Sequence, residues 1–105
     1  MTKGDIVLVP FPFTDLTGSK LRPALVLAVN MNDIIVAFVS SQLSLKSEYN
    51  VRISPNNYNG LKTTSVIKVS KIATLEKKII QGKLGYLEYQ TIIEVNKKLY
   101  KFLKL

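Results

Sequence analysis

The sequence predicts a mainly β fold, in which five or six short strands form a small barrel that one C-terminal helix caps. Runs rich in valine and isoleucine recur at close spacing, and residues typical of turns (Gly, Pro, Asn, Asp and Ser) separate them. Beyond residue 87 the apolar residues change to helical spacing. At 105 residues, without repeats or a linker, the chain is expected to form one domain over residues 1–105.

The first predicted strand is Asp5–Phe13, in which apolar residues alternate loosely. Pro10 and Pro12 cannot donate to a sheet ladder, so this strand must end or lie on an edge there. Residues Thr14–Lys20 have loop chemistry. Further strands are predicted at Ala24–Val29, which Arg22-Pro23 opens, and at Ile34–Val39, Tyr49–Ile53, Thr63–Val69 and Lys71–Leu75.

Three of these elements carry more detail. The run Ile34–Val39 is almost continuously apolar, which predicts burial on both faces of the sheet. Ser70 separates the last two strands as a predicted bulge. The segment Leu87–Leu103 predicts a helix whose apolar face covers the barrel and whose lysine side faces solvent. The apolar face consists of Tyr89, Ile92, Ile93, Leu99, Phe102 and Leu103.

The charge of the chain indicates an anionic partner. Fifteen Lys and Arg against seven Asp and Glu give a net charge of +8, which favours nucleic acid or an acidic protein. The alternative is a solvated lysine surface, because no compact basic run is present. The longest apolar runs are too short to span a bilayer, so we expect no membrane contact. The lack of cysteine favours the cytoplasm.

The absence of histidine excludes several classes of enzyme. Without His or Cys there is no Ser-His-Asp or Cys-His unit, no histidine general base and no imidazole or thiolate metal ligand. The seven carboxylates are scattered along the sequence instead of forming the close cluster of a two-metal nuclease. We therefore expect neither a metal ion nor another cofactor.

Four ordered blocks resemble the MazF/PemK family of toxin endoribonucleases. A "G-D-I" strand, Gly4–Pro10, is followed by the loop Phe13–Leu21 and then by an "R-P-A-L-V-L" strand, Arg22–Leu27. The apolar strand Ile35–Gln42, which ends in serines, is the next block, and Ser65–Lys68 and Ala73–Glu76 complete the pattern. A lone Arg-Pro pair would carry no information, whereas these blocks cover most of the chain in the family's order and spacing.

This resemblance implies an SH3-like barrel of the MazF/PemK/CcdB type that works as a homodimer. Family members cut single-stranded mRNA at short sequences without metal, through attack of the 2′-hydroxyl, and leave a 2′,3′-cyclic phosphate and a 5′-hydroxyl. A cognate antitoxin inhibits them, and for this basic chain an acidic antitoxin is expected. Two other functions stay open: a toxin that binds DNA gyrase on the same fold, and an RNA-binding regulator that does not cleave.

The resemblance assigns catalytic roles to Arg22, Ser40 and Lys68. A guanidinium can bind two phosphoryl oxygens and stays charged, so Arg22 suits charge stabilisation and not general base catalysis. The alternative is that Arg22 orders the loop by pairing with Asp15. A hydroxyl at Ser40 can donate to phosphate, or it can satisfy a turn. Lys68 stands where some relatives carry an arginine, and Ser70 stands where those relatives carry an aspartate.

The predicted RNA contacts lie in the first loop and after the third strand. Phe11 and Phe13 are candidates for base stacking, although aromatic residues on a barrel strand more often pack in the core. The polar contacts are expected from Thr14, Asp15, Thr17, Ser19, Lys20, Ser41, Gln42 and Lys71.

Overall fold

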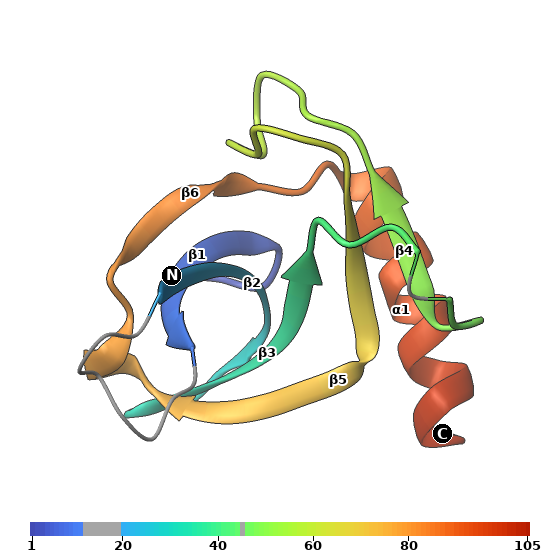
Figure 1. Ribbon diagram of the computed structural model, residues 1–105. Coiled ribbons are helices and arrows are strands. Elements are labelled where there is room, and N and C mark those ends of the chain that lie inside the picture. The colour runs from blue at the N-terminus through green and yellow to red at the C-terminus, as the bar shows by residue number, and fades with distance from the viewer. Residues whose placement is uncertain (12–19, 45) are drawn as a thin grey trace.

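The computed structural model describes residues 1–11, 20–44 and 46–105, and within them six strands form one antiparallel sheet (Figure 1). A 3-10 turn and one helix complete the described elements. Their bounds are β1 (Asp5–Phe11), β2 (Lys20–Val29), β3 (Asp33–Ser40), β4 (Asn50–Ile53), β5 (Ser65–Glu76), η1 (Lys77–Ile79), β6 (Gly82–Tyr86) and α1 (Tyr89–Leu103). The predicted mainly β fold with a C-terminal helix is confirmed.

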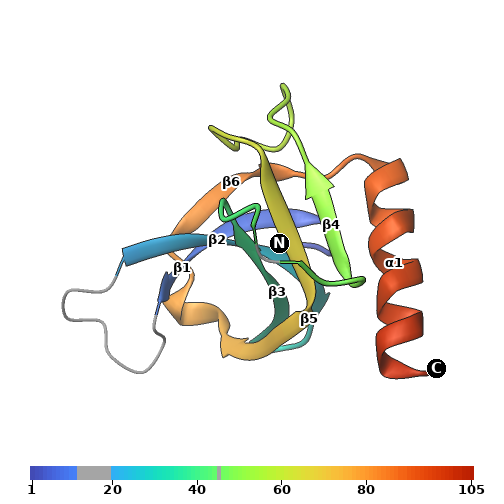
Figure 2. The same ribbon diagram turned by 45° about the vertical axis from the view of Figure 1, so that its right-hand side comes forward.

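The sheet has the order β4-β5-β3-β2-β1-β6 and curls into a half-barrel, which brings its two edges towards each other (Figures 1 and 2). The connection between β4 and β5 spans the gap. The backbone N–H of Tyr86 on β6 donates to the carbonyl oxygen of Tyr58 at 2.9 Å. A Cβ at Gly85 would lie 2.0 Å from that same oxygen, so the two backbones meet at a position that only glycine fits.

Alternation along the strands divides the apolar residues between two clusters on opposite faces of the sheet. The larger cluster includes Ile6, Leu25, Ala37, Val39 and Ile67, and the helix residue Val95 joins it. The smaller cluster comprises Val7, Val9, Ala24, Val26, Ile34, Val36 and Leu75, with Phe38, Ala73, Ile79 and Ile80 packed against it. We call the face that carries the smaller cluster face B.

Helix α1 lies beside β4 and β5 (Figure 2) and covers the larger cluster. Of the predicted apolar face, Ile92 and Leu99 pack on that cluster. Tyr89 does not pack there: it is the first residue of the helix and is 73% exposed. The most buried residue of the helix is Val95, which the predicted face omitted. No helix in the described part of the chain is long and apolar enough to cross a membrane.

Three further sequence expectations meet the structure here. The two predicted strands around Ser70 are one strand, β5, and its register with β3 shifts between Lys68 and Ile72, so the bulge at Ser70 is confirmed. Burial of β3 on both faces is wrong at Ile35, which is 37% exposed. The strands that α1 mainly contacts are β4 and β5, and not β3. Strand β6 was missed, since its two glycines give it little local preference for a strand.

Candidate functional site

The ladder between β2 and β3 leaves the first four residues of β2, Lys20–Pro23, without a partner on β3. Its last paired residues are Ala24 and Phe38. The next residue of β2 is Pro23, which has no N–H to donate, and from there β2 pairs only with β1. Arg22 is therefore held against Val9 on one side, while its other side is free of the ladder with β3. The Arg-Pro pair thus opens the sheet at this point.

The candidate catalytic residues lie on face B, on three strands that are neighbours in the sheet, β2, β3 and β5. Lys68 on β5 is opposite Phe38 on β3, which is itself opposite Ala24, so these side chains share one face. Two residues further along β2 and β3, on the same face, lie Arg22 and Ser40. Continuing the register of β2 and β3 by two residues sets Arg22 opposite Ser40. The sequence-predicted trio is thus gathered at one end of face B.

The hydroxyl of Ser40 has a defined local role. Its Oγ accepts a hydrogen bond from the backbone N–H of Gln42 at 3.1 Å, which ends β3 in a tight turn. This is the turn-satisfying role that the sequence left open. It is compatible with a chemical role as well, because a hydroxyl that accepts one bond still has its own O–H to donate. The turn fixes where that donor is held.

The cations of this region form no ion pair with any carboxylate among the described residues. In residues 1–11, 20–44 and 46–105, the ion pairs join Lys78 to Glu76, Lys83 to Asp5 and Lys101 to Glu48. None of them involves Arg22, Lys20 or Lys68. Lys20 opens β2 and alternates onto the same face as Arg22, and both side chains are exposed. Arg22, Lys20 and Lys68 are therefore in no ion pair with any residue that the structure describes.

The other predicted contacts are less well placed. Ser41 and Gln42 follow the end of β3 and are exposed. Lys71 lies within the bulge of β5 and has no register partner on β3. The remaining predicted positions, Thr14, Asp15, Thr17, Ser19 and Phe13, lie outside the described residues, as does the side chain of Phe11.

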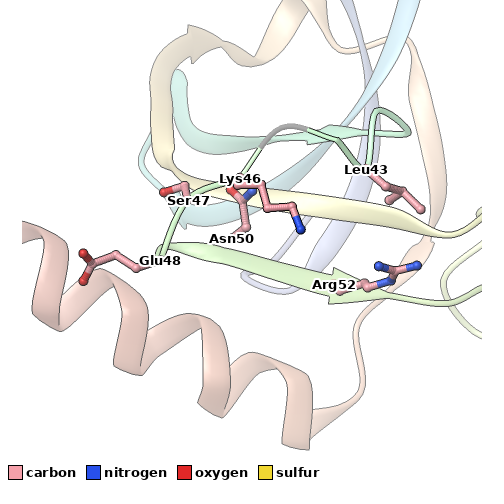
Figure 3. A pocket seen from close by; sticks show the side chains of 6 residues that line it. All are labelled: Leu43, Lys46, Ser47, Glu48, Asn50 and Arg52. Carbon is pink, nitrogen blue, oxygen red and sulfur yellow. The ribbon is translucent and has the colours of Figure 1, made fainter.

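An open groove of about 430 Å³ lies at the edge strand β4 (Figure 3). Lys46 and Arg52 extend along it, whereas Glu48 points towards α1. The groove is lined by Leu43, Lys46, Ser47, Glu48, Asn50 and Arg52. Sequence reasoning missed these residues. The available signal was Arg52, which with Arg22 completes the two arginines of the chain and alternates with buried Val51 and Ile53.

The segment that leads into β4 is fastened to the C-terminal half of α1. The Lys101 ammonium lies 2.7 Å from the Glu48 carboxylate, and the Lys98 ammonium donates to the Glu48 carbonyl oxygen at 2.6 Å. The hydrogen bond and the positive charge of Lys101 lower the pKa of Glu48 below its usual value of 4.5. The rings of Tyr49 and Phe102 meet edge to face at 5.0 Å. These contacts fix one wall of the groove.

Among the described residues, no three His, Cys, Asp or Glu side chains lie close enough to form a metal ligand set.

Proteins of known structure share this fold. Solved structures similar to this chain include an endoribonuclease in complex with its cognate antitoxin from Mycobacterial species, with a TM-score of 0.81 and 18% identity over 100% of this chain and 96% of that chain. The Mycobacterium tuberculosis toxin MazF-mt6 has a TM-score of 0.79 and 18% identity over 96% and 97%. MazF from Deinococcus radiodurans has a TM-score of 0.78 and 20% identity over 100% and 97%.

At these identities the structures show a shared fold. None of the curated protein sequences matches the chain. The family model of the PemK-like, MazF-like toxins of type II toxin–antitoxin systems matches residues 2–103, nearly the whole chain. The chain therefore belongs to the PemK-like, MazF-like toxin family of type II toxin–antitoxin systems.

Proposed function

We propose that this toxin is a metal-independent, sequence-specific endoribonuclease that cleaves single-stranded mRNA. The observation that carries the proposal is the convergence of Arg22, Ser40 and Lys68 on one end of face B, from strands β2, β3 and β5. Two cations that pair with no described carboxylate and one oriented hydroxyl form a suitable site for a phosphodiester.

In the proposed reaction the 2′-hydroxyl of the substrate attacks the adjacent phosphorus and the 5′ oxygen leaves, which yields a 2′,3′-cyclic phosphate and a 5′-hydroxyl. Arg22 binds two phosphoryl oxygens and stabilises the charge that develops on them. Lys68 adds a second positive charge from β5, and the Ser40 hydroxyl donates to a phosphoryl oxygen. In this scheme the two cations act through their charge and their hydrogen bonds to the phosphoryl oxygens.

We also propose the partners that follow from family membership. The toxin acts in the cytoplasm as a homodimer, and an acidic cognate antitoxin holds it inactive. The net charge of +8 supports an acidic partner. One similar solved structure is an endoribonuclease with its cognate antitoxin, and another is a MazE–MazF complex from Deinococcus radiodurans.

The test is cleavage of a random-sequence single-stranded RNA pool by the purified protein in excess EDTA, followed by mapping of the ends. We expect products with 5′-hydroxyl ends that cluster at a short sequence, and we expect Arg22→Ala to be inactive while it remains folded. Intact RNA with the wild-type protein, or equal cleavage by Arg22→Ala, would falsify the proposal.

The same assay separates the two alternatives. RNA that is bound by the protein but never cut would identify a non-cleaving regulator, a function that the lysine at position 68 and the serine at position 70 keep open. Intact RNA together with poisoning of gyrase in a supercoiling assay would identify a gyrase-binding toxin.

A further inference from the structure

We propose that the groove at β4 is a second phosphate-binding subsite, in which Arg52 and Lys46 hold the RNA backbone beside the nucleotide that is cleaved. The inference rests on the proposed endoribonuclease function. It extends that function to residues outside the proposed catalytic group of Arg22, Ser40 and Lys68.

The register makes the groove continuous with the candidate catalytic site. Arg52 on β4 is opposite Val66 on β5, and Val66 is opposite Ser40 on β3. Arg52 therefore shares face B with Ser40 and lies two strands away, a backbone separation of about 10 Å at the usual strand spacing. An extended strand of RNA that crosses the sheet from Ser40 towards its edge passes over Arg52.

The charges of the groove suit a phosphate chain. Arg52 and Lys46 are both exposed, and within the described residues no carboxylate is within ion-pair distance of either. The one acidic side chain of the lining, Glu48, is directed towards α1 and is bound by Lys101. The groove consequently presents two positive charges that no described carboxylate neutralises.

The shape and chemistry also favour the RNA backbone as the ligand. The guanidinium of Arg52 has the planar geometry that binds phosphate through two hydrogen bonds. The groove is open along one side and spans about 430 Å³, which suits a chain that runs through it. Its wall is held in place by the contacts of Glu48 and Tyr49 with α1, so little ordering is required on binding.

The experiment compares Arg52→Gln, Lys46→Gln and the double variant with Lys3→Gln, which removes one exposed charge at the start of β1. Binding is measured by fluorescence anisotropy with a random-sequence 30-nucleotide RNA that carries 2′-O-methyl groups, which removes the attacking hydroxyl. Cleavage is measured under single-turnover conditions with the unmethylated pool.

We expect the double variant to bind the methylated RNA about tenfold more weakly and to lower the slope of log affinity against log salt by about 1. We expect its cleavage rate at saturating protein to equal that of the wild type, because the subsite binds substrate and transition state alike. Binding and salt dependence equal to those of Lys3→Gln would overturn the inference.

Two outcomes distinguish failure of this inference from failure of the proposed endoribonuclease function. A wild-type protein that cuts no RNA overturns the proposed function, yet the binding measurements still decide whether the groove holds an RNA backbone. If Arg52→Gln weakens binding of poly-glutamate and leaves RNA binding unchanged, the groove takes an acidic protein and the inference is wrong.

Discussion

Charged residues at the two ends of β1 differ in whether they are paired within the protein. At the start of β1, the Asp5 carboxylate accepts from the Thr2 backbone N–H at 3.0 Å and lies 3.2 Å from the Lys83 ammonium. At the other end of β1, Arg22 lies across from Val9, and none of the described ion pairs includes it. Asp5 is paired within the protein, whereas no described carboxylate pairs with Arg22.

The difference separates polar residues that stabilise the fold from those that we propose to bind a ligand. A charge that is paired and buried contributes to stability, so its removal should change unfolding and leave chemistry alone. A charge that is exposed and unpaired contributes little to stability. Its removal should change activity and leave unfolding alone. The predictions below test this distinction between charges that stabilise the fold and charges that act in chemistry.

The largest effect is expected for Arg22→Lys. Lysine keeps the positive charge but loses the planar fork, so one phosphoryl contact in the transition state is lost. We expect the rate of RNA cleavage to fall about 10²-fold, with the melting temperature unchanged. Lys68→Arg is the matched control, because it adds a fork on the same face and should not slow cleavage. A lower melting temperature for Arg22→Lys would show that this residue also holds the fold.

Gly85→Ala disrupts the contact between β6 and the connection from β4 to β5. The new Cβ would lie 2.0 Å from the Tyr58 carbonyl oxygen and 2.7 Å from the Asn59 carbonyl carbon, and backbone atoms cannot move aside cheaply. We expect a loss of about 3 kcal/mol in the free energy of unfolding, measured by urea denaturation. Gln81→Ala, just before the same strand, should change it by less than about 0.5 kcal/mol. The rate of cleavage per folded molecule should stay the same for both variants.

Asp5→Ala tests the satisfied carboxylate itself. Only 8% of the Asp5 side chain is exposed, and its removal leaves the Thr2 N–H without its acceptor. We expect a loss of about 1–3 kcal/mol. Lys83→Met removes the other partner, whose side chain is 54% exposed, and should cost about 0–1 kcal/mol. Equal losses for the two variants would mean that the ion pair, and not the hydrogen bond to Thr2, provides the stabilisation.

The smallest effect is expected at the contact between Glu48 and Lys101. Because Lys101 lowers the pKa of Glu48 in the folded state, this contact stabilises the fold above pH 4.5 and is lost as the pH falls through the lowered pKa. Glu48→Gln should therefore melt slightly below the wild type at pH 7, and the difference should disappear once the pH is below the lowered pKa of Glu48. A difference that persists in acid would assign the effect to packing instead of charge.

Local patterns in the sequence predicted most of the elements. Val- and Ile-rich runs predicted β1 to β5, the helical spacing predicted α1, and Ser70 was correctly placed at a bulge. Strand β6 was not predictable in this way, because pairing with β1 and the contact of Gly85 with Tyr58 make it a strand. The exposed position of Tyr89 was equally hidden, since it depends on how much of the helix the sheet covers.

The sequence by itself determined which residues carry the candidate chemistry. Arg22-Pro23 at the return of a loop, Ser40 at the end of an apolar strand and the excess of positive charge are all local or compositional features. Only the tertiary structure decided which of them meet. Register across strands is set by the packing of whole faces, and this register puts Ser40 and Lys68 on the face of Arg22 and adds Arg52 from an edge strand.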